Sequence, residues 1–223
     1  MPNPYAPVST SVGDYLKAIW MRGGGETVTT TILAEHLGIS PASVSGMLVR
    51  LQGTGLIDYQ RYRGVRLTAR GRREAMRLIR RHRLIETFMI AQLGYSWNEV
   101  HSEAETLEHA ISDRFAERLA QLLGYPSHDP HGDPIPNPDG TLPATPNTPL
   151  VEAVIQQRLR VARLLTQDPE VLAYMTELGI EPGREIRILE RDQIGGLLHA
   201  EVDGAHQVLS LGLAKLILGE VLS

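Results

Sequence analysis

Residues 39–68 read ISPASVSGMLVRLQGTGLIDYQRYRGVRLT, and this stretch decides the fold of the N-terminal part of the chain. Ser40 is a strong helix cap and Pro41 suits the first helical position, so we expect a helix to begin there. A shorter helix is expected over TTILAEHLG at 30–38, because its apolar residues are followed by a terminal glycine. Two short helices joined by a tight turn, the second opening with small hydroxyl residues, indicate a helix-turn-helix.

The second half of the same stretch, LIDYQRYRGVRLT at 56–68, predicts two short strands around Arg63 and Gly64. A hairpin directly after a helix-turn-helix is the wing of a winged helix, and the two together are much more specific than either part alone. Arginines at the hairpin tip would reach DNA phosphates. The residues that we expect to contact DNA are Ser40, Pro41, Ala42, Ser43, Ser45, Arg50, Arg61 and Arg63.

The distribution of charge supports a DNA partner, although the whole chain is acidic. The formal net charge is −4, yet the arginines concentrate between residues 50 and 83, where only Asp58 and Glu74 oppose them. A cationic first half on an anionic protein is typical of a DNA-binding domain joined to a ligand-binding domain. The alternative is a set of solvated helix faces, because arginine is also a good helix former.

Length and composition set further limits. With 223 residues, 42% of them hydrophobic, the chain is globular and long enough for two or three small domains. It has no cysteine, which excludes disulfides, thiolate zinc sites and a cysteine nucleophile. We find neither a signal peptide nor an apolar stretch that could span a bilayer, and we therefore expect a cytoplasmic protein with no membrane partner.

A candidate metal-binding segment is HSEAETLEH at 101–109, inside a helix that we expect over roughly 97–123. Its two imidazoles and two of its three carboxylates fall on one face of a helix at that spacing. These four residues are His101, Glu105, Glu108 and His109.

A second pair, His82 and Glu86, has a four-residue spacing in an earlier helix that we expect over 69–94. Together with the HSEAETLEH segment, the pair suggests ligands for a divalent metal. The alternative is a solvated polar face that carries charge pairs.

The C-terminal part begins after a change of composition. Eight of the 14 prolines lie between Tyr125 and Pro149, which indicates a loop or linker, and we interpret His128 and His131 as loop residues. Beyond it, VEAVIQQRLRVARLL is compatible with a helix or a strand, whereas DPEVLAYMTELG predicts a helix capped by Asp168. The segments EIRILER, LLHAEVD and QVLSLG predict short strands, and several of these in one segment suggest a small barrel.

Three segments resemble the diphtheria-toxin-repressor family of metal-dependent transcriptional repressors, in particular its manganese-responsive type. They are RRHRLIETFM at 80–89, VHSEAETLEHAISD at 100–113 and PHGDPIP at 130–136, and the winged helix precedes them in the expected order. The resemblance implies a mainly α fold with small β parts, in which LRVARLL is the first strand of the barrel. We expect a winged helix-turn-helix at 1–74, a helical dimerisation and metal-binding domain with a Pro-rich linker at 75–147, and an SH3-like (FeoA-like) barrel at 148–223.

The resemblance also implies two neighbouring metal sites. The first would use Asp14, Glu105, Glu108 and His109. The second would use His82, Glu86 and His101, with Asp168 and Glu170 as candidate ligands from the barrel domain. Glu170 is considered because Val171 occupies the matching family position, and valine cannot bind a metal.

The donor atoms favour manganese over iron. Iron-responsive members carry Met and Cys where this chain has Asp14 and Glu105, and hard oxygens in place of soft sulfurs favour Mn(II). Some manganese-responsive members add a second acid three residues after the aspartate; here that position is Lys17, a departure from their two-metal arrangement. Gly46 replaces a glutamine of the family's type member, so specificity would lean on phosphate contacts and DNA shape.

The resulting hypothesis is a Mn(II)-dependent repressor that acts as a homodimer on a palindromic operator and controls metal-ion uptake. Other divalent transition metals would bind in vitro, and the main alternative is an Fe(II)-dependent repressor of iron-homeostasis genes with the same fold. An enzyme is not expected, because the spacing of His82 and Glu86 is HxxxE rather than the HExxH of metallohydrolases. A winged helix that senses an organic ligand would leave the clustered histidines and glutamates unexplained.

Overall fold

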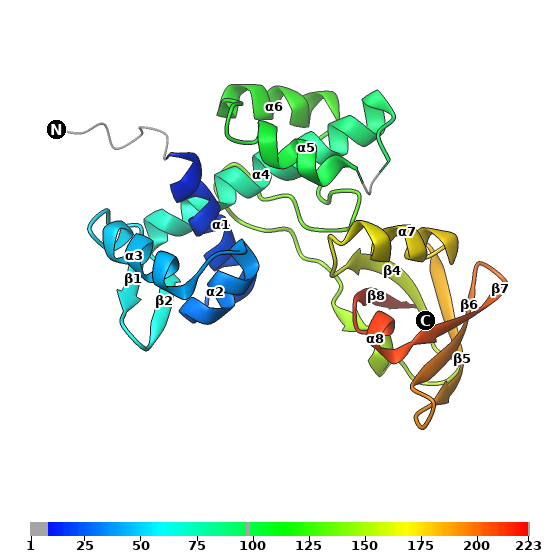
Figure 1. Cartoon of the computed structure of the whole chain (residues 1–223). Coiled ribbons are helices and arrows are strands. Elements are labelled where there is room, and N and C mark those ends of the chain that lie inside the picture. Colours follow the sequence, from blue (N-terminus) through cyan, green and yellow to red (C-terminus); the bar gives the residue numbers. More distant parts are fainter. Residues whose placement is uncertain (1–8, 97–98, 223) are drawn as a thin grey trace. The chain divides into compact units, whose positions relative to one another are not determined.

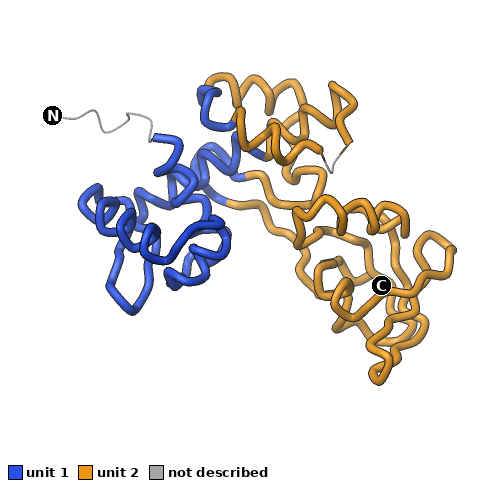
Figure 2. The backbone as a smooth tube through the Cα atoms, viewed as in Figure 1, with its two compact units in different colours: residues 1–82, 108–113, 136–141 blue, residues 83–107, 114–135, 142–223 orange. Residues whose placement is uncertain are grey.

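The computed structural model describes residues 9–96 and 99–222. These residues form two compact units, and each has its own hydrophobic core (Figure 2). The first unit comprises 1–82, 108–113 and 136–141, and the second comprises 83–107, 114–135 and 142–223.

The first unit begins with three helices and a hairpin (Figure 1). They are α1 (Thr10–Gly23), α2 (Thr30–Leu37), α3 (Pro41–Gln52), β1 (Ile57–Gln60) and β2 (Gly64–Leu67). The axes of α2 and α3 meet at 110°, within the range of a helix-turn-helix. The Ser40 hydroxyl accepts a hydrogen bond from the Ser43 amide at 3.2 Å, and Pro41 occupies the first turn, as the sequence predicts.

The predicted wing is confirmed as an antiparallel hairpin. Its register runs from Ile57 opposite Leu67 to Gln60 opposite Gly64, which leaves three residues in the connecting loop. A bridge between Val28 and Val65 attaches the hairpin to the chain between α1 and α2. The core beneath consists of apolar side chains from all three helices, including Leu16, Ile19, Leu33, Leu48 and Leu51.

The long helix α4 (Ala69–Leu93) follows the wing, and Gly94, with a φ of 73°, ends it as predicted. The single helix that we expected over 97–123 is wrong. Residues 97–98 lie outside the described residues, and the rest forms two helices, α5 (Val100–Leu107) and α6 (Asp113–Leu122). The break between them places Glu108 and His109 in a turn instead of on a helix face.

The C-terminal part of the second unit is a six-stranded antiparallel sheet with two helices. The sheet order is β3-β8-β4-β5-β6-β7. The elements are β3 (Thr148–Pro149), the 3-10 turn Leu150–Glu152, β4 (Arg158–Leu164), α7 (Pro169–Glu177), β5 (Glu185–Asp192), β6 (Leu197–Val202), β7 (Ala205–Ser210), α8 (Leu211–Ala214) and β8 (Ile217–Leu222). The ambiguous LRVARLL segment is indeed strand β4, and α7 is inserted between β4 and β5.

The proline-rich segment before this sheet has the irregular backbone that its composition predicts, and around residues 129–135 it is packed into the second unit. Gly132 lies against β4, where a Cβ atom would stand 1.9 Å from the Ala162 carbonyl oxygen. The Leu164 amide donates a hydrogen bond to the His131 carbonyl at 2.9 Å, and Arg163 forms an ion pair with Asp133. This packing buries side chains that composition alone assigns to an exposed loop.

Among the described residues, no single helix is long and apolar enough to cross a membrane; α2 and α3 pass that test only as a bent pair.

Two glycines in helices give a test of the packing of the first unit. A Cβ atom on Gly71 in α4 would lie 1.9 Å from the Leu56 carbonyl oxygen, whereas one on Gly46 in α3 would meet nothing within 4 Å. Gly71→Ala should therefore destabilise the protein by about 1–3 kcal/mol through overpacking. Gly46→Ala should stabilise it by up to about 1 kcal/mol through helix propensity. Denaturant unfolding of both variants checks the opposite signs, and a stable Gly71→Ala variant would contradict the close approach of α4 to Leu56.

Candidate metal centre

The first cluster of possible ligands joins α1 to the turn after α5. The carboxylate of Asp14 on α1 and the side chains of Glu108 and His109 offer ligand atoms that all lie within 4.8 Å of one another. His109 Nε2 is 2.7 Å from Asp14 Oδ1 and 3.6 Å from Glu108 Oε1. Asp14 thus meets two adjacent residues from a distant part of the sequence at one point of the first unit.

Glu108 is the most buried member of this cluster, with a side chain that has no exposed surface. Lys17, one turn after Asp14 on α1, places its Nζ 3.0 Å and 2.8 Å from the two Glu108 carboxylate oxygens. His82 Nδ1 on α4 is hydrogen-bonded to Glu108 Oε2 and lies 3.2 Å from Lys17 Nζ. A buried carboxylate needs such partners because the loss of its hydration is costly.

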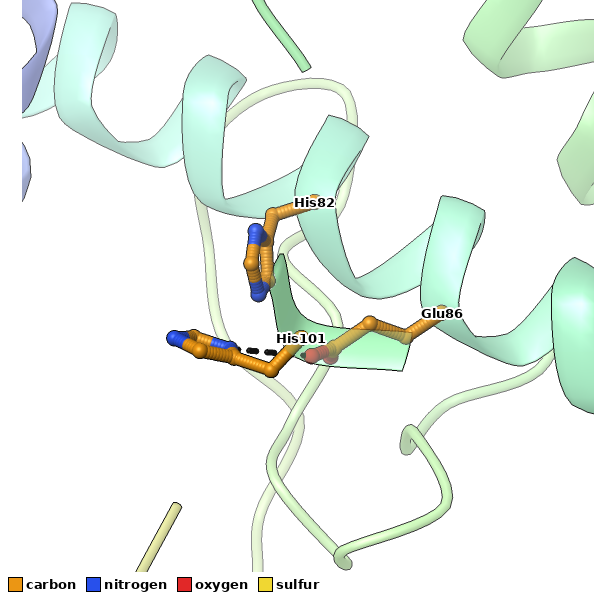
Figure 3. A group of neighbouring side chains, drawn as sticks. All are labelled: His82, Glu86 and His101. Atoms are coloured by element: carbon orange, nitrogen blue, oxygen red, sulfur yellow. Dashed lines mark hydrogen bonds and ion pairs between the residues drawn. The ribbon is translucent and has the colours of Figure 1, made fainter. Parts of the chain in front are cut away.

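The second cluster belongs to α4 and α5. His101 Nδ1 lies 3.2 Å from Glu86 Oε1, and Glu86 is fully buried. Figure 3 shows this pair together with His82, which precedes Glu86 by one turn of α4. Glu105, the remaining predicted ligand on α5, lies with its Oε1 3.6 Å from His101 Nε2.

Two further candidate ligands stand beside Glu86 and were missed in the sequence. Asp129 and His131 are buried, and with Glu86 they offer ligand atoms within 4.8 Å of one another. His131 is a loop residue, as its sequence context predicts, but proline-rich composition does not reveal that the side chain is buried. The signal that could have found both is the DPHGDPIP segment at 129–136, in which Gly132 packs against β4.

Charge in this second cluster is only partly compensated. Arg83 Nε lies 3.4 Å from Asp129, Arg83 Nη2 lies 3.6 Å from Asp133, and Arg163 pairs with Asp133. Burial, together with the nearby carboxylates of Asp133 and Glu86, raises the pKa of Asp129 to about 8. The Asp129 carboxyl is therefore protonated at neutral pH, and a divalent cation bound there would replace that proton.

The two ligands expected from the C-terminal domain have another role in the structure. Asp168 caps α7, since its Oδ1 accepts hydrogen bonds from the amides of Glu170 at 2.9 Å and Val171 at 3.4 Å. Neither Asp168 nor Glu170 joins a group of possible ligands among the described residues.

Both clusters have the chemistry of a site for a hard or borderline divalent metal. Their donors are carboxylate oxygens and imidazole nitrogens, and the chain contains no thiol. Such donor sets suit manganese, iron(II) and zinc, whereas calcium and magnesium prefer oxygen ligands alone. The residues present therefore fit a transition metal.

Family comparisons cover most of the chain in three consecutive segments. Residues 8–65 match the N-terminal DNA binding domain of iron dependent repressors, residues 68–137 match their metal binding and dimerisation domain, and residues 148–221 match the FeoA domain. The chain is also 41% identical, with a TM-score of 0.88, to a manganese-dependent transcriptional repressor solved with manganese, covering 95% of this chain and 100% of that one. The chain belongs to the diphtheria-toxin-repressor family. Its members are metal-dependent repressors that bind DNA and dimerise, and they are not enzymes.

Other members of the diphtheria-toxin-repressor family match over a similar length. The diphtheria toxin repressor of Corynebacterium diphtheriae is 29% identical over 189 residues, which is 80% of this chain and 84% of that protein. The iron-dependent repressor IdeR of Mycobacterium leprae is 28% identical over 190 residues, which is 78% of this chain and 81% of that protein. The structure of ScaR with bound Cd²⁺ has a TM-score of 0.80 and 36% identity, covering 94% of this chain and 98% of that one.

The predicted fold class is thereby confirmed for this family member: a winged helix-turn-helix, a helical metal-binding and dimerisation domain, and an SH3-like FeoA domain. The residues that we expect to contact DNA lie on α3 and the wing of the first of these. Except for Ser45, which is half-buried, all of them are exposed. They are Ser40, Pro41, Ala42, Ser43, Ser45, Arg50, Arg61 and Arg63.

Lys17 gives a test of the first cluster. Because its ammonium contacts both oxygens of Glu108, Lys17 and a metal ion would compete for that carboxylate. At an effective dielectric constant of about 20, two unit charges about 4 Å apart interact by roughly 4 kcal/mol. Lys17→Met should therefore raise the affinity for Mn(II) by about tenfold or more, measured by calorimetric titration.

A matched control for this prediction is Lys215→Met, which removes the other lysine of the chain from an exposed position after α8. Its affinity for Mn(II) should equal that of the unmodified protein. Weaker binding by Lys17→Met would show that the lysine organises Glu108 for the metal instead of competing with it.

Proposed function

We propose that the protein is a Mn(II)-dependent DNA-binding repressor that controls metal-ion uptake. The observation that carries this proposal is the first cluster, in which Asp14, Glu108 and His109 present only oxygen and nitrogen donors. Hard oxygen donors favour Mn(II) over metals that prefer sulfur. The similarity to a repressor solved with manganese supports the same metal.

We propose that the first site consists of Asp14, Glu108 and His109 together with Glu105, which precedes Glu108 by three residues. Asp14 lies on α1, in the DNA-binding domain. Glu105 lies on α5, and Glu108 and His109 lie in the turn that follows α5. The metal would supply a double positive charge that holds carboxylates from both segments. Asp14 and His109 are already paired at 2.7 Å, so the protein side of this connection is largely preformed.

We propose that the second site is centred on Glu86 and His101, with His82 from the preceding turn of α4. Asp129 and His131 are the stronger candidates for its remaining ligands, because they are buried beside Glu86. Asp168 and Glu170 are weaker candidates, because the Asp168 carboxylate already caps α7.

For DNA, we propose a homodimer on a palindromic operator. Each α3 would lie in a major groove, with the small residues Ala42, Ser43 and Ser45 near base edges. Arg50, Arg61 and Arg63 would bind phosphates. The three-domain division at 1–74, 75–147 and 148–223 remains part of this proposal.

An Fe(II)-dependent repressor of iron-homeostasis genes is the second candidate function. The observation in its favour is the similarity over about four fifths of the chain to relatives that are named iron-dependent repressors or diphtheria toxin repressor. Against it stand the oxygen donors of Asp14 and Glu105, at the two positions where the iron-responsive members carry Met and Cys.

The metal-site assignment predicts the behaviour of two variants. Asp14→Ala and Glu105→Ala should each abolish the stimulation of operator binding by Mn(II), because each removes a ligand from one side of the connection. The fold and the dimer should persist, as judged by thermal unfolding and by size-exclusion chromatography with light scattering. DNA binding is measured by fluorescence anisotropy with and without Mn(II).

Glu103→Ala is the matched control, because Glu103 is an exposed acid on the same helix α5, two residues before Glu105. It should respond to Mn(II) like the unmodified protein. Metal-dependent binding by both Asp14→Ala and Glu105→Ala would refute the assignment.

The choice of metal has its own test. In an anaerobic titration of operator binding, saturating Mn(II) should activate DNA binding to a greater extent than saturating Fe(II). Fe(II) naturally binds nitrogen and oxygen donors more tightly than Mn(II), so the comparison must be of activation and not of affinity alone. Full activation by Fe(II), with little by Mn(II), would favour the second candidate function.

A further inference from the structure

The tip of the wing has an unusual backbone conformation at Tyr62. Its φ is 68°, in the left-handed region that bulky side chains rarely adopt. The Arg63 amide donates a hydrogen bond to the Gln60 carbonyl at 3.0 Å, so Tyr62 is the third residue of a tight turn. With a positive φ, that turn position normally takes glycine or asparagine. The fold of the hairpin therefore does not explain a tyrosine here.

Packing does not explain it either, because 92% of the Tyr62 surface is exposed. The guanidinium of Arg61 lies 5.1 Å from the centre of the ring, and this is a contact between neighbours in the loop. A strained residue that stabilises neither its turn nor a core is a candidate for a functional contact.

Tyr125 shows what a structural explanation looks like in this chain. It also has a positive φ, 57°, and is 63% exposed. Its amide, however, donates a 2.7 Å hydrogen bond to the Ala120 carbonyl, directly after Gly124 at the end of α6. This bond belongs to the termination of a helix, in which Gly124, with a φ of 73°, takes the left-handed conformation and the next amide satisfies a free carbonyl. Tyr125 thus has a place in a helix end, which Tyr62 lacks.

The charges beside Tyr62 indicate what its ring would meet. Arg61 and Arg63 flank it, and both are exposed. In a nucleic-acid strand, phosphates alternate with sugars. Guanidinium groups on either side of an aromatic ring suit such a strand, because they can bind successive phosphates while the ring packs against the sugar between them. Proteins that enter the minor groove combine such cationic side chains with apolar ones.

We propose that Tyr62 is a DNA-contacting residue whose ring packs against the sugar edge of the minor groove, between phosphates bound by Arg61 and Arg63. This inference rests on the proposed DNA-binding function and adds a contact that carries no charge and reads no base. Tyr62 therefore contributes equally to all duplex sequences and releases no counterions from the DNA.

The test compares Tyr62→Gly and Tyr62→Asn with the unmodified protein in the presence of Mn(II). Both replacements accept a positive φ, and asparagine keeps a side chain in the turn while removing the ring. Thermal stability should be unchanged or higher in both. Affinity for the operator and for unrelated duplex DNA should fall by the same factor, about tenfold, which is about 1.4 kcal/mol.

The salt dependence of DNA binding distinguishes a contact made by the Tyr62 ring from a contact made by the neighbouring arginines. The slope of log affinity against log salt concentration should stay the same for Tyr62→Gly, whereas Arg61→Gln should reduce it by about one phosphate contact. Tyr62→Phe should keep most of the affinity. Tyr125→Gly, the matched control at the other exposed tyrosine with a positive φ, should bind DNA normally once its dimeric state has been verified.

Unchanged DNA affinity in Tyr62→Gly would overturn the inference. A loss in Tyr62→Gly with normal binding by Tyr62→Asn would also overturn it, because stiffness of the loop would then be the cause. Failure of the unmodified protein to bind any duplex DNA with Mn(II) would instead refute the proposed function, so the two failures are distinguishable.

Discussion

The carboxylate of Glu108 is the constraint on which the first cluster of candidate ligands depends. Its side chain has no exposed surface, so its charge must be compensated by groups that the fold brings to it. Lys17 on α1 and His82 on α4 both contact it, which ties two helices to the turn after α5. A single buried charge therefore joins three segments that are separated by up to 91 positions in the sequence.

The identity of the compensating cation matters in this chain. Of its 22 basic residues, all but Lys17 and Lys215 are arginines. The small ammonium of Lys17 donates to both oxygens of Glu108, and His82 Nδ1, which donates to one of these oxygens, lies 3.2 Å from Nζ. A planar guanidinium is larger and rigid, whereas an ammonium is a compact point charge that fits beside the imidazole. Lysine is thus the basic residue whose shape fits beside this buried carboxylate.

The sequence predicted the parts of this architecture that local signals determine, and it missed those that depend on contacts between distant residues. Ser40 with Pro41, and Asp168 with Pro169, are local caps, and they placed the starts of α3 and α7 correctly. The break between α5 and α6 was missed because apolar residues continue at helical spacing through it. The turn is stabilised by long-range contacts, such as Asp113 with Arg77 and Arg81, which periodicity cannot reveal.

The same difference between local and long-range signals explains which candidate ligands the sequence predicts and which it does not. Regular spacing identified His82, Glu86 and His101 because helices convert sequence intervals into shared faces. Asp129 and His131 lie in a proline-rich segment without periodicity, and only its packing against β4 buries them. Composition correctly indicated an irregular backbone there, but irregular backbone can be as buried as a helix when its polar groups find partners.

The two clusters solve the problem of buried negative charge in different ways. Around Glu108, the chain provides its own cation in Lys17, at contact distance from both carboxylate oxygens. Around Glu86, Asp129 and Asp133, Arg83 and Arg163 pair with the two aspartates, and His101 contacts Glu86. Burial and the acidic neighbours raise the pKa of Asp129 to about 8, so its carboxyl holds a proton at neutral pH. A metal at the first cluster would have to displace or share an existing ion pair, whereas a metal at the second would have to displace the proton that Asp129 holds at neutral pH.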